Sequence, residues 1–459
     1  MPAISTHTRL LLEIKMLLLM LLRERRERRE QQRRQQRRRR ILEQRQQLLR
    51  QRGQQQQQQQ RRGPYQTAVH HRQQGDKSFF LNYYRLLPQN FDTLLSIVAA
   101  DLTRVQLFDP LVPAEQLALT LSYLGSGNEM DQVALAYRVS FQTAKRCILH
   151  TCRVIWARLK DRFMPTPTKD HWKKIASGFS TRWQFPNCLG VVEGKHVAIL
   201  RPQQSENKYI NYKGTHSIVL MGVVDSSCKY VLVDVGAEGR LGEGGTLKDC
   251  KFGKALVNGD LDIPPPGPLP GTTRTVPYVF IGDESFQLRK DVMRPFPARQ
   301  REDERRVFNY RLNRAKRCAE NAFNLTVFRW QILLRKINLP PADVDYIVKV
   351  ACVLHNFVMD LEPLSKDYPD QEDDFGNVKE GPWRPIMRNI ILWDKEKHFF
   401  PLEATLSRNH TSEAAHTRNL ITAYFCGKEG EVPWQWSQSG VSKEGALKRL
   451  REEPCYQLL

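Results

Sequence analysis

Apolar residues recur at helical spacing through the first ordered part of the chain. Aromatic and aliphatic positions between Phe79 and Val98 fall on one helical face, with Pro88 as a break between two segments. Further helices are predicted over residues 114–124, 130–137 and 141–159. This pattern predicts a helical region over residues 64–164, in which residues 114–159 contain the last three helices.

Only Arg138-Val139-Ser140 separates the last two of these helices, and Ser140 is a favourable N-cap. Two helices joined by so few residues fit a helix-turn-helix motif. Its second helix would present polar side chains near its N-terminus, the end that reads bases: Gln142, Thr143, Lys145 and Arg146. An ordinary helical hairpin has the same pattern, so the sequence leaves DNA contact by this helix open.

Short apolar runs bounded by turn residues replace the helical pattern after residue 188. Strands are predicted over residues 189–199, 217–225, 229–235 and 277–282. The second and third are predicted to form a hairpin around a tight Asp-Ser-Ser-Cys turn. Helices are predicted over residues 246–256, 299–334 and 343–361. Together these elements predict a mixed α/β (α+β) domain over residues 165–360, with a mixed sheet flanked by helices.

Three carboxylates occupy defined places in this order of elements. Glu193 ends an apolar run of the first strand, Asp283 follows the fourth strand, and Glu320 lies beside the apolar stripe of the helix over 299–334. In an RNase H-like order these three places meet at one edge of the sheet. Because clustered carboxylates repel unless a hard dication neutralises them, the cluster predicts Mg²⁺ or Mn²⁺. Two such ions can activate water at a phosphodiester. The local sequence around Glu193 also suits an exposed β-turn.

The positive charge of the chain is concentrated at its N-terminus. The net charge is +22, and residues 1–62 hold 17 Arg and 1 Lys against 5 Glu, which is +13. Residues 1–63 are rich in Arg and Gln and are predicted to form a disordered basic tail. Such a tail favours a polyanion such as DNA, and a solubilising tail without a partner is the alternative.

Cysteine spacing and hydropathy bear on the compartment. The nine cysteines form no C-x-x-C pair, which argues against a zinc ribbon or disulfide framework and for a reducing compartment. The apolar run over 16–22 is too short to cross a bilayer, so no membrane is expected. The Arg-rich run is compatible with nuclear import, and we expect the protein in the nucleus and also in the cytoplasm.

His355 lies on the apolar side of its helix and is interpreted as a core histidine rather than a ligand.

Several motifs in order resemble the PIF/Harbinger transposases and the Harbinger transposase-derived nucleases of animals. They are Trp-Gln-Phe-Pro-Asn-Cys-Leu-Gly-Val-Val-Glu-Gly-Lys-His over 183–196, and the segments 249–256, 282–286, 307–323 and 352–357. The resemblance covers about residues 78–436. It implies an RNase H-like DDE nuclease domain, metal-dependent hydrolysis or strand transfer on DNA, and a Myb/SANT-like protein as partner. We also expect three basic residues near the acids to contact DNA: Lys195, Arg314 and Arg317.

Two departures from the family concern the acids. The family has Asp-Gly where this chain has Glu193-Gly194, and Asp in the Gly-rich loop where this chain has Glu243. We assign Asp283 as the second acid of the triad, with Glu243 as its rival and as a further metal ligand. A carboxylate displaced by about 1 Å can cost on the order of 10² in rate. Three functions therefore stay open: a nuclease with weakened catalysis, a DNA-binding protein that has lost catalysis, and an interaction protein that recruits partners.

The last segment, residues 361–459, is predicted to be a linker and tail with one helix over about 416–425. The sequence does not fix the oligomeric state, and an oligomer is compatible with it.

Overall fold

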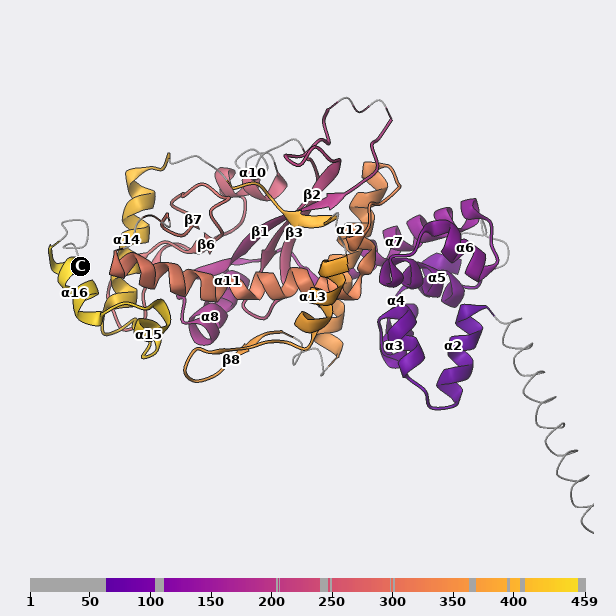
Figure 1. Ribbon diagram of the computed structural model, residues 1–459, viewed down its shortest axis with the longest axis horizontal. Helices are drawn as coiled ribbons and strands as arrows, with labels where there is room; N and C mark the ends of the chain where they lie inside the picture. Colours follow the sequence, from indigo (N-terminus) through magenta and orange to yellow (C-terminus); the bar gives the residue numbers. More distant parts are fainter. Residues whose placement is uncertain are drawn as a thin grey trace, which may run out of the picture. The chain divides into compact units, whose positions relative to one another are not determined.

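The structure is a computed structural model, shown in Figure 1. It describes residues 63–103, 111–203, 205, 207–239, 247, 250–297, 299, 302–362, 369–393, 397–404 and 409–452. The predicted basic tail over 1–62 and the loop residue Glu243 lie outside the described residues. The contacts within the chain divide it after Thr67, and the account below concerns the unit Ala68–Leu459.

Helices fill the region before the sheet, as the apolar spacing predicted. They are α2 (Pro64–Gln73), α3 (Ser78–Tyr84), α4 (Pro88–Thr103), α5 (Pro113–Ser126), α6 (Met130–Tyr137) and α7 (Phe141–Phe163). Helix α5 contacts α3, α4, α6 and α7, and its residues Leu117 and Leu121 are fully buried. It is therefore the central helix of this part of the unit.

The turn between α6 and α7 is as short as predicted. Arg138 takes a left-handed conformation with φ 57°, which ends α6. The Ser140 hydroxyl accepts a hydrogen bond from the Thr143 backbone N–H at 3.1 Å and so caps α7. Helix α7 continues to Phe163, four residues beyond the predicted end, because its last turn packs on α12 (Pro341–Leu361). Asn356 of α12 donates a hydrogen bond to the Phe163 carbonyl at 2.8 Å.

A mixed sheet forms the centre of the nuclease-like region. Its strands are β1 (Cys188–Ala198), β2 (Ser217–Val224), β3 (Tyr230–Glu238), β6 (Val279–Ile281), β7 (Val292–Met293) and β10 (Phe399–Pro401). The order is β3-β2-β1-β6-β7, and β10 also pairs with β1. The first three strands are antiparallel, β6 is parallel to β1, and β7 is parallel to β6. This mixed α/β architecture confirms the predicted fold class.

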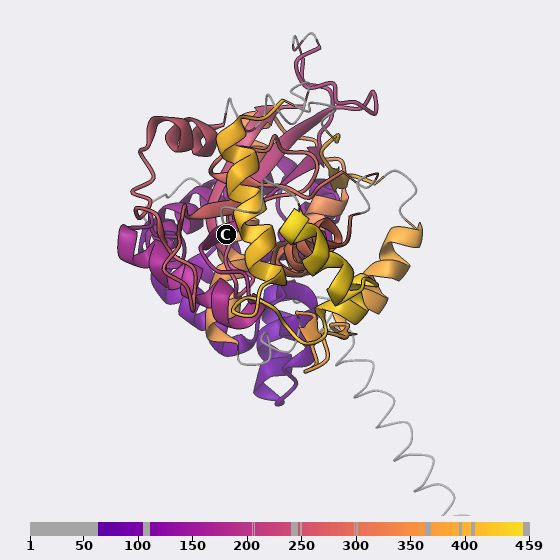
Figure 2. The ribbon, with the colours of Figure 1, turned by 90° about the vertical axis from the view of Figure 1, so that its left-hand side faces the viewer.

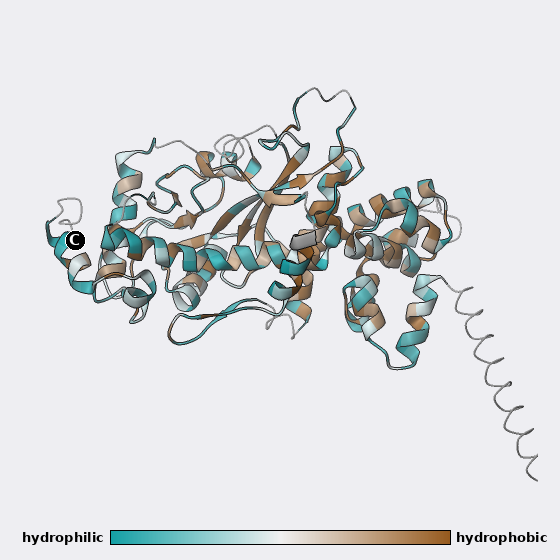
Figure 3. Ribbon diagram, in the orientation of Figure 1, coloured by the Kyte–Doolittle hydropathy of each residue, from teal (hydrophilic) through white to brown (hydrophobic). Residues whose placement is uncertain are grey.

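Helices and short elements surround this sheet. They are α8 (Lys169–Trp183), α10 (Lys251–Asn258), α11 (Asp303–Arg329), η1 (Gln331–Leu334), α12, and the two-stranded pairs β4 (Gly267–Pro268) with β5 (Thr275–Val276) and β8 (Gln371–Glu372) with β9 (Val378–Lys379). Helix α11 contacts β1 and β2, α12 contacts β3, and α8 contacts β1. Every residue of β2 is buried. Figure 3 shows the apolar strands enclosed by helices with polar outer faces, which explains the nearly continuous apolar runs.

The C-terminal region is not the linker and tail that the sequence predicted. The expected helix is present as α14 (Ser412–Cys426), but α13 (Trp383–Trp393), α15 (Gln435–Ser439) and α16 (Lys443–Glu452) accompany it. Helices α14, α15 and α16 pack around one end of α11, as Figures 1 and 2 show. Phe425 of α14 lies against Phe185, with ring centroids 5.1 Å apart. Since β10 joins the central sheet, this region completes the fold.

The described residues bear on the sequence expectations about membrane spans, the cysteines and His355. Within those residues, none of the helices has the length and apolar character needed to span a membrane. All eight cysteines of the described part are buried and free, so none of them contributes to a disulfide framework. His355 is buried, and its Nε2 lies 2.8 Å from the Cys228 carbonyl oxygen. This hydrogen bond agrees with its interpretation as a core histidine.

Candidate functional site

The register of the sheet brings two of the predicted acids to one place. Val191 of β1 lies opposite Ile281 of β6 in a parallel pairing. Glu193 and Asp283 each follow two residues later. Because side chains alternate across a strand and lateral neighbours point the same way, this register directs both carboxylates to one face of the sheet. Glu193 is buried, and Asp283 is partly exposed beyond the end of β6.

Helix α11 brings the third acid to the same face. Gly222 of β2 is the partner of Glu193 across the antiparallel pair. A Cβ atom at Gly222 would lie 3.0 Å from the ring of Phe323, a residue of α11, so the helix packs directly on this face. Glu320 precedes Phe323 by three residues and therefore lies on the same side of the helix.

A lysine lies beside the first of these acids. Lys195 follows Glu193 by two residues on β1, so both side chains lie on one face. Its Nζ is 2.6 Å from Glu193 Oε1, and the two side chains are 19% and 11% exposed. Burial acts to lower the pKa of Lys195, but the carboxylates of Glu193, Asp283 and Glu320 outweigh it and the pKa is raised. The charges of all three predicted acids thus act on one ammonium group.

Asp283 and Glu320 also have partners of their own, through hydrogen bonds and an ion pair respectively. Asp283 Oδ1 accepts a hydrogen bond from the Ser285 backbone N–H at 3.0 Å, and the Ser285 hydroxyl donates to the same oxygen. Glu320 is 59% exposed, and its Oε2 lies 3.5 Å from a guanidinium nitrogen of Arg384. Arg384, on α13, is itself held by the fully buried carboxylate of Asp370. The acids are therefore neighbours whose oxygens are directed at protein groups.

Two of the predicted DNA-contacting arginines have internal partners instead. Arg314 is 5% exposed, and its Nε lies 2.5 Å from Glu372 of β8. Its guanidinium also donates to the Trp183 carbonyl at 2.9 Å. Arg317 pairs with the same Glu372 carboxylate and is 18% exposed. These ion pairs fix β8 to α11, and they direct both guanidinium groups away from solvent. DNA contact by Arg314 and Arg317 is thus not supported by their placement, because burial and pairing with Glu372 give them a structural role.

The helix-turn-helix residues lie at the accessible start of α7. Gln142 and Arg146 are exposed, and Lys145 and Thr143 are half-buried. Arg146 Nε donates to the Gln142 carbonyl at 3.4 Å, while Thr143 contributes its N–H to the Ser140 cap. The geometry of two helices with a three-residue turn is present, and the contact of this helix with DNA stays a prediction.

A cluster of cations at the end of β1 was missed in the sequence. Backbone bonding brings three segments together there: the Leu200 N–H donates to the Ile337 carbonyl at 3.1 Å, and the Ala198 N–H donates to the His398 carbonyl at 2.9 Å. Exposed basic residues adjoin these positions, and we name them the β1-end cations: Arg201, Lys213, Lys336 and Lys397. They come from segments far apart in the sequence, so no local motif could reveal them.

Electrostatic effects relate the β1-end cations in two sets, Lys213 with Lys397, and Arg201 and Lys336 around His216. Partial burial lowers the pKa of Lys213, and the Lys397 ammonium lowers it further. Partial burial also lowers the pKa of His216, and the positive charges of Arg201 and Lys336 add to that shift. Like charges held together repel one another, so this surface is favourable for an anion.

Aromatic side chains support these cations. Lys213 Nζ lies 3.8 Å from the centroid of the Phe400 ring on β10. His196 stacks on Phe400 at 4.9 Å and shares a hydrogen-bonding distance of 2.8 Å with the Ser217 hydroxyl. Burial, with a smaller effect of Lys213, lowers the pKa of His196 to about 4. Tyr212 is 45% exposed beside this group.

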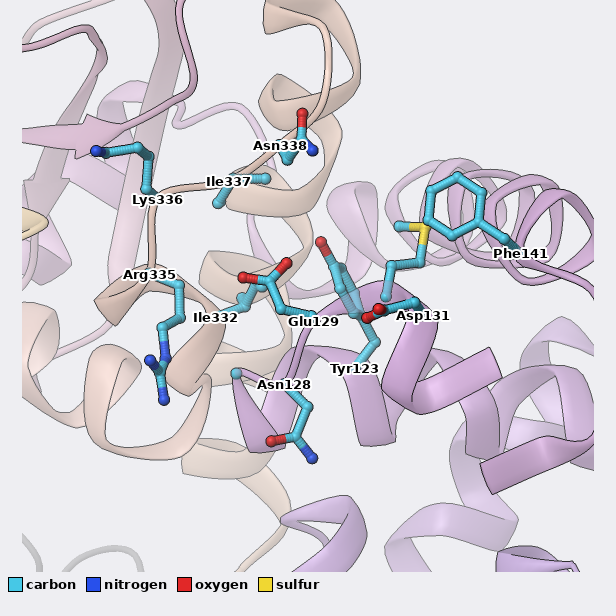
Figure 4. A pocket seen from close by; sticks show the side chains of 12 residues that line it. Tyr123, Asn128, Glu129, Asp131, Phe141, Ile332, Arg335, Lys336, Ile337 and Asn338 are labelled. Atoms are coloured by element: carbon cyan, nitrogen blue, oxygen red, sulfur yellow. The ribbon is translucent and has the colours of Figure 1, made fainter. Parts of the chain in front are cut away.

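A separate pocket of about 360 Å³ lies between the α5–α6 connection and the segment after η1. Figure 4 shows acidic side chains, Glu129 and Asp131, on one wall and basic ones, Arg335 and Lys336, on the other. The three predicted acids do not line it. Its mixed charge gives no preference for one ligand class.

Comparison with known proteins identifies the sheet region. Residues 192–356 match the DDE superfamily endonuclease family. The protein ALP1-like of Arabidopsis thaliana is 24% identical over 301 residues, or 64% of this chain and 73% of that protein. The Antagonist of like heterochromatin protein 1 of Arabidopsis thaliana is 25% identical over 300 residues, or 63% and 75%. HARBI1 of Mus musculus, which carries a provisional nuclease name, is 23% identical over 291 residues, or 61% and 78%. No solved structure gives a significant match.

The fold and the matched segment define a protein with a DDE-type endonuclease domain. The resemblance to Harbinger transposase-derived proteins that the motifs predicted is confirmed by this domain match and by the similar proteins.

Endonucleases of the DDE superfamily generally use divalent metal ions, so the acids were compared with what such an ion requires. Mg²⁺ and Mn²⁺ are bound by several oxygen ligands directed at one point. Within the described residues, no group of three or more His, Cys, Asp or Glu side chains is placed to hold a metal ion. Glu193 is directed at Lys195 and Glu320 at Arg384. The described arrangement therefore does not fit a divalent ion, although it fits the order of a DDE triad.

Proposed function

We propose that this chain is a nuclear DNA-binding protein built on a DDE nuclease domain, with weak or absent cleavage of phosphodiester bonds. The observation that carries the proposal is the group of exposed β1-end cations. Cations that repel one another without bound DNA gain stability when phosphates neutralise them. Two of the acids, Glu193 and Glu320, are already paired with Lys195 and Arg384, which supports weak cleavage.

A metal-dependent endonuclease is the second candidate, and one observation favours it. Glu193, Asp283 and Glu320 all act on the same ammonium group of Lys195, so the three carboxylates share one region of the fold. Family resemblance favours the same function. The two candidates differ in cleavage and agree in DNA binding, so DNA binding is the property to test first.

Removing three of the β1-end cations is expected to weaken DNA binding and its salt dependence. In the triple variant Arg201→Ala/Lys213→Ala/Lys397→Ala, each lost phosphate contact should reduce the slope of log K against log[salt] by about 0.9, for a total of up to about three. Fluorescence anisotropy with a labelled duplex, titrated at several salt concentrations, measures this slope.

The matched control removes the same charge from exposed positions elsewhere, in Lys254→Ala/Lys379→Ala/Lys428→Ala. We expect its slope to stay close to that of the natural protein. If the two triple variants lose the same slope, the β1-end cations are not a specific surface and the proposal fails.

Replacing the two basic residues at the start of α7 tests the helix-turn-helix reading. We expect Lys145→Ala/Arg146→Ala to weaken DNA binding by about 1–3 kcal/mol, because the first turns of a recognition helix make the base contacts. The control Lys160→Ala/Arg162→Ala removes the same charge from exposed positions at the other end of α7. Equal losses in both pairs, or no loss in either, would identify α6 and α7 as an ordinary helical hairpin.

A further inference from the structure

The place that a divalent ion would take in this fold is next to the carboxylate of β1, facing α11. In the structure the Lys195 ammonium lies there, 2.6 Å from Glu193 Oε1. Lys195 is the one residue of β1 that is not fully buried, yet its side chain is only 19% exposed. A buried ammonium at ion-pair distance offers positive charge to the carboxylates without any bound ion.

We propose that Lys195 replaces the divalent ion of the DDE site with a cation from the chain itself. The side chain reaches this position because residues two apart on a strand share one face. Strand pairing also fixes the backbone of Lys195, since this residue lies opposite Leu220 of β2 on one side and Pro401 of β10 on the other. The lysine is held in the sheet and therefore has a fixed position among the acids.

Charge explains why the two cations exclude each other. One buried carboxylate needs a counter-charge, and Lys195 supplies it to Glu193. A divalent ion close to the same carboxylate would also lie close to the ammonium. At an effective dielectric constant near 20, an ammonium and a divalent ion about 4 Å apart repel strongly enough to lower a binding constant by at least about 10³-fold. Lys195 thus leaves the site without a metal.

The test is binding of Mn²⁺ alone, without DNA, so its outcome is separate from that of the DNA-binding proposal. Electron paramagnetic resonance of free Mn²⁺ measures binding to the natural protein and to Lys195→Met, which keeps the length of the side chain and removes its charge. We expect Lys195→Met to bind Mn²⁺ on the order of 10³-fold more tightly than the natural protein, because the repulsion by the ammonium is removed. Mn²⁺ should also raise the melting temperature of Lys195→Met, and leave that of the natural protein unchanged.

Two controls complete the design. Lys195→Arg keeps the cation and should bind Mn²⁺ as weakly as the natural protein, and the exposed Lys428→Met should do the same. Adding Glu193→Gln to Lys195→Met should remove the gained binding. If Lys195→Met does not fold, Lys195→Gln takes its place. The titration of the natural protein decides in any case: tight Mn²⁺ binding that Glu193→Gln abolishes overturns the proposal, and its absence supports it.

Discussion

Replacing Glu372 by alanine is expected to lower the free energy of unfolding by about 3–5 kcal/mol. The carboxylate is 9% exposed and neutralises two guanidinium groups of α11, Arg314 and Arg317. Without it, both arginines remain in the interior with no carboxylate partner, and β8 loses its attachment to the helix. Urea unfolding followed by tryptophan fluorescence measures the change as a lower midpoint with an unchanged m value.

The matched control is Glu380→Ala, because Glu380 pairs with Arg388 on the surface, where the side chains are 48% and 58% exposed. An exposed pair contributes at most about 1 kcal/mol, so this variant should unfold close to the natural midpoint. Similar small losses for both variants would mean that Glu372 does not hold the two arginines. Arg314 and Arg317 would then return to the set of residues that could contact DNA.

Local patterns were sufficient to predict most of the elements that position the site. Helix α7 was predicted from its apolar spacing, and its first residue from Ser140. An N-cap bonds to the first turn of its own helix, so it can be recognised from neighbouring residues alone. The strands β1 and β2 were predicted because burial on both faces leaves continuous apolar runs. The places of Glu193, Asp283 and Glu320 followed from these elements.

Features that depend on distant contacts could not be predicted in this way. β10 is three residues long, and it is a strand because it pairs with β1, about 200 residues earlier in the chain. The β1-end cations likewise come from separate segments. Lys195 was expected to contact DNA because its charge is visible in the sequence. Its burial beside Glu193 is set by the strands and the helix that enclose it.

Replacing Glu193 by aspartate is expected to raise DNA cleavage by on the order of 10² over the natural protein. The family has aspartate at this position, and the shorter side chain draws the carboxylate back by one methylene. The same change lengthens the 2.6 Å contact between Glu193 and Lys195, so the carboxylate becomes available to other cations. Asp283→Ala or Glu320→Ala in this background should abolish the gain, because each removes one acid of the triad.

Nicking of supercoiled plasmid at a fixed Mn²⁺ concentration tests the central claim most directly. It compares the natural protein, Glu193→Asp, and Asp283→Ala, with DNA binding of each variant measured on the same samples. If none of them cuts while all bind DNA, the binding function stands and the gain expected from Glu193→Asp is wrong. The account predicts that the natural protein binds the plasmid but nicks it no faster than Asp283→Ala, while Glu193→Asp cuts. Cleavage by the natural protein as fast as by Glu193→Asp, and lost in Asp283→Ala, would contradict the account and establish a working nuclease.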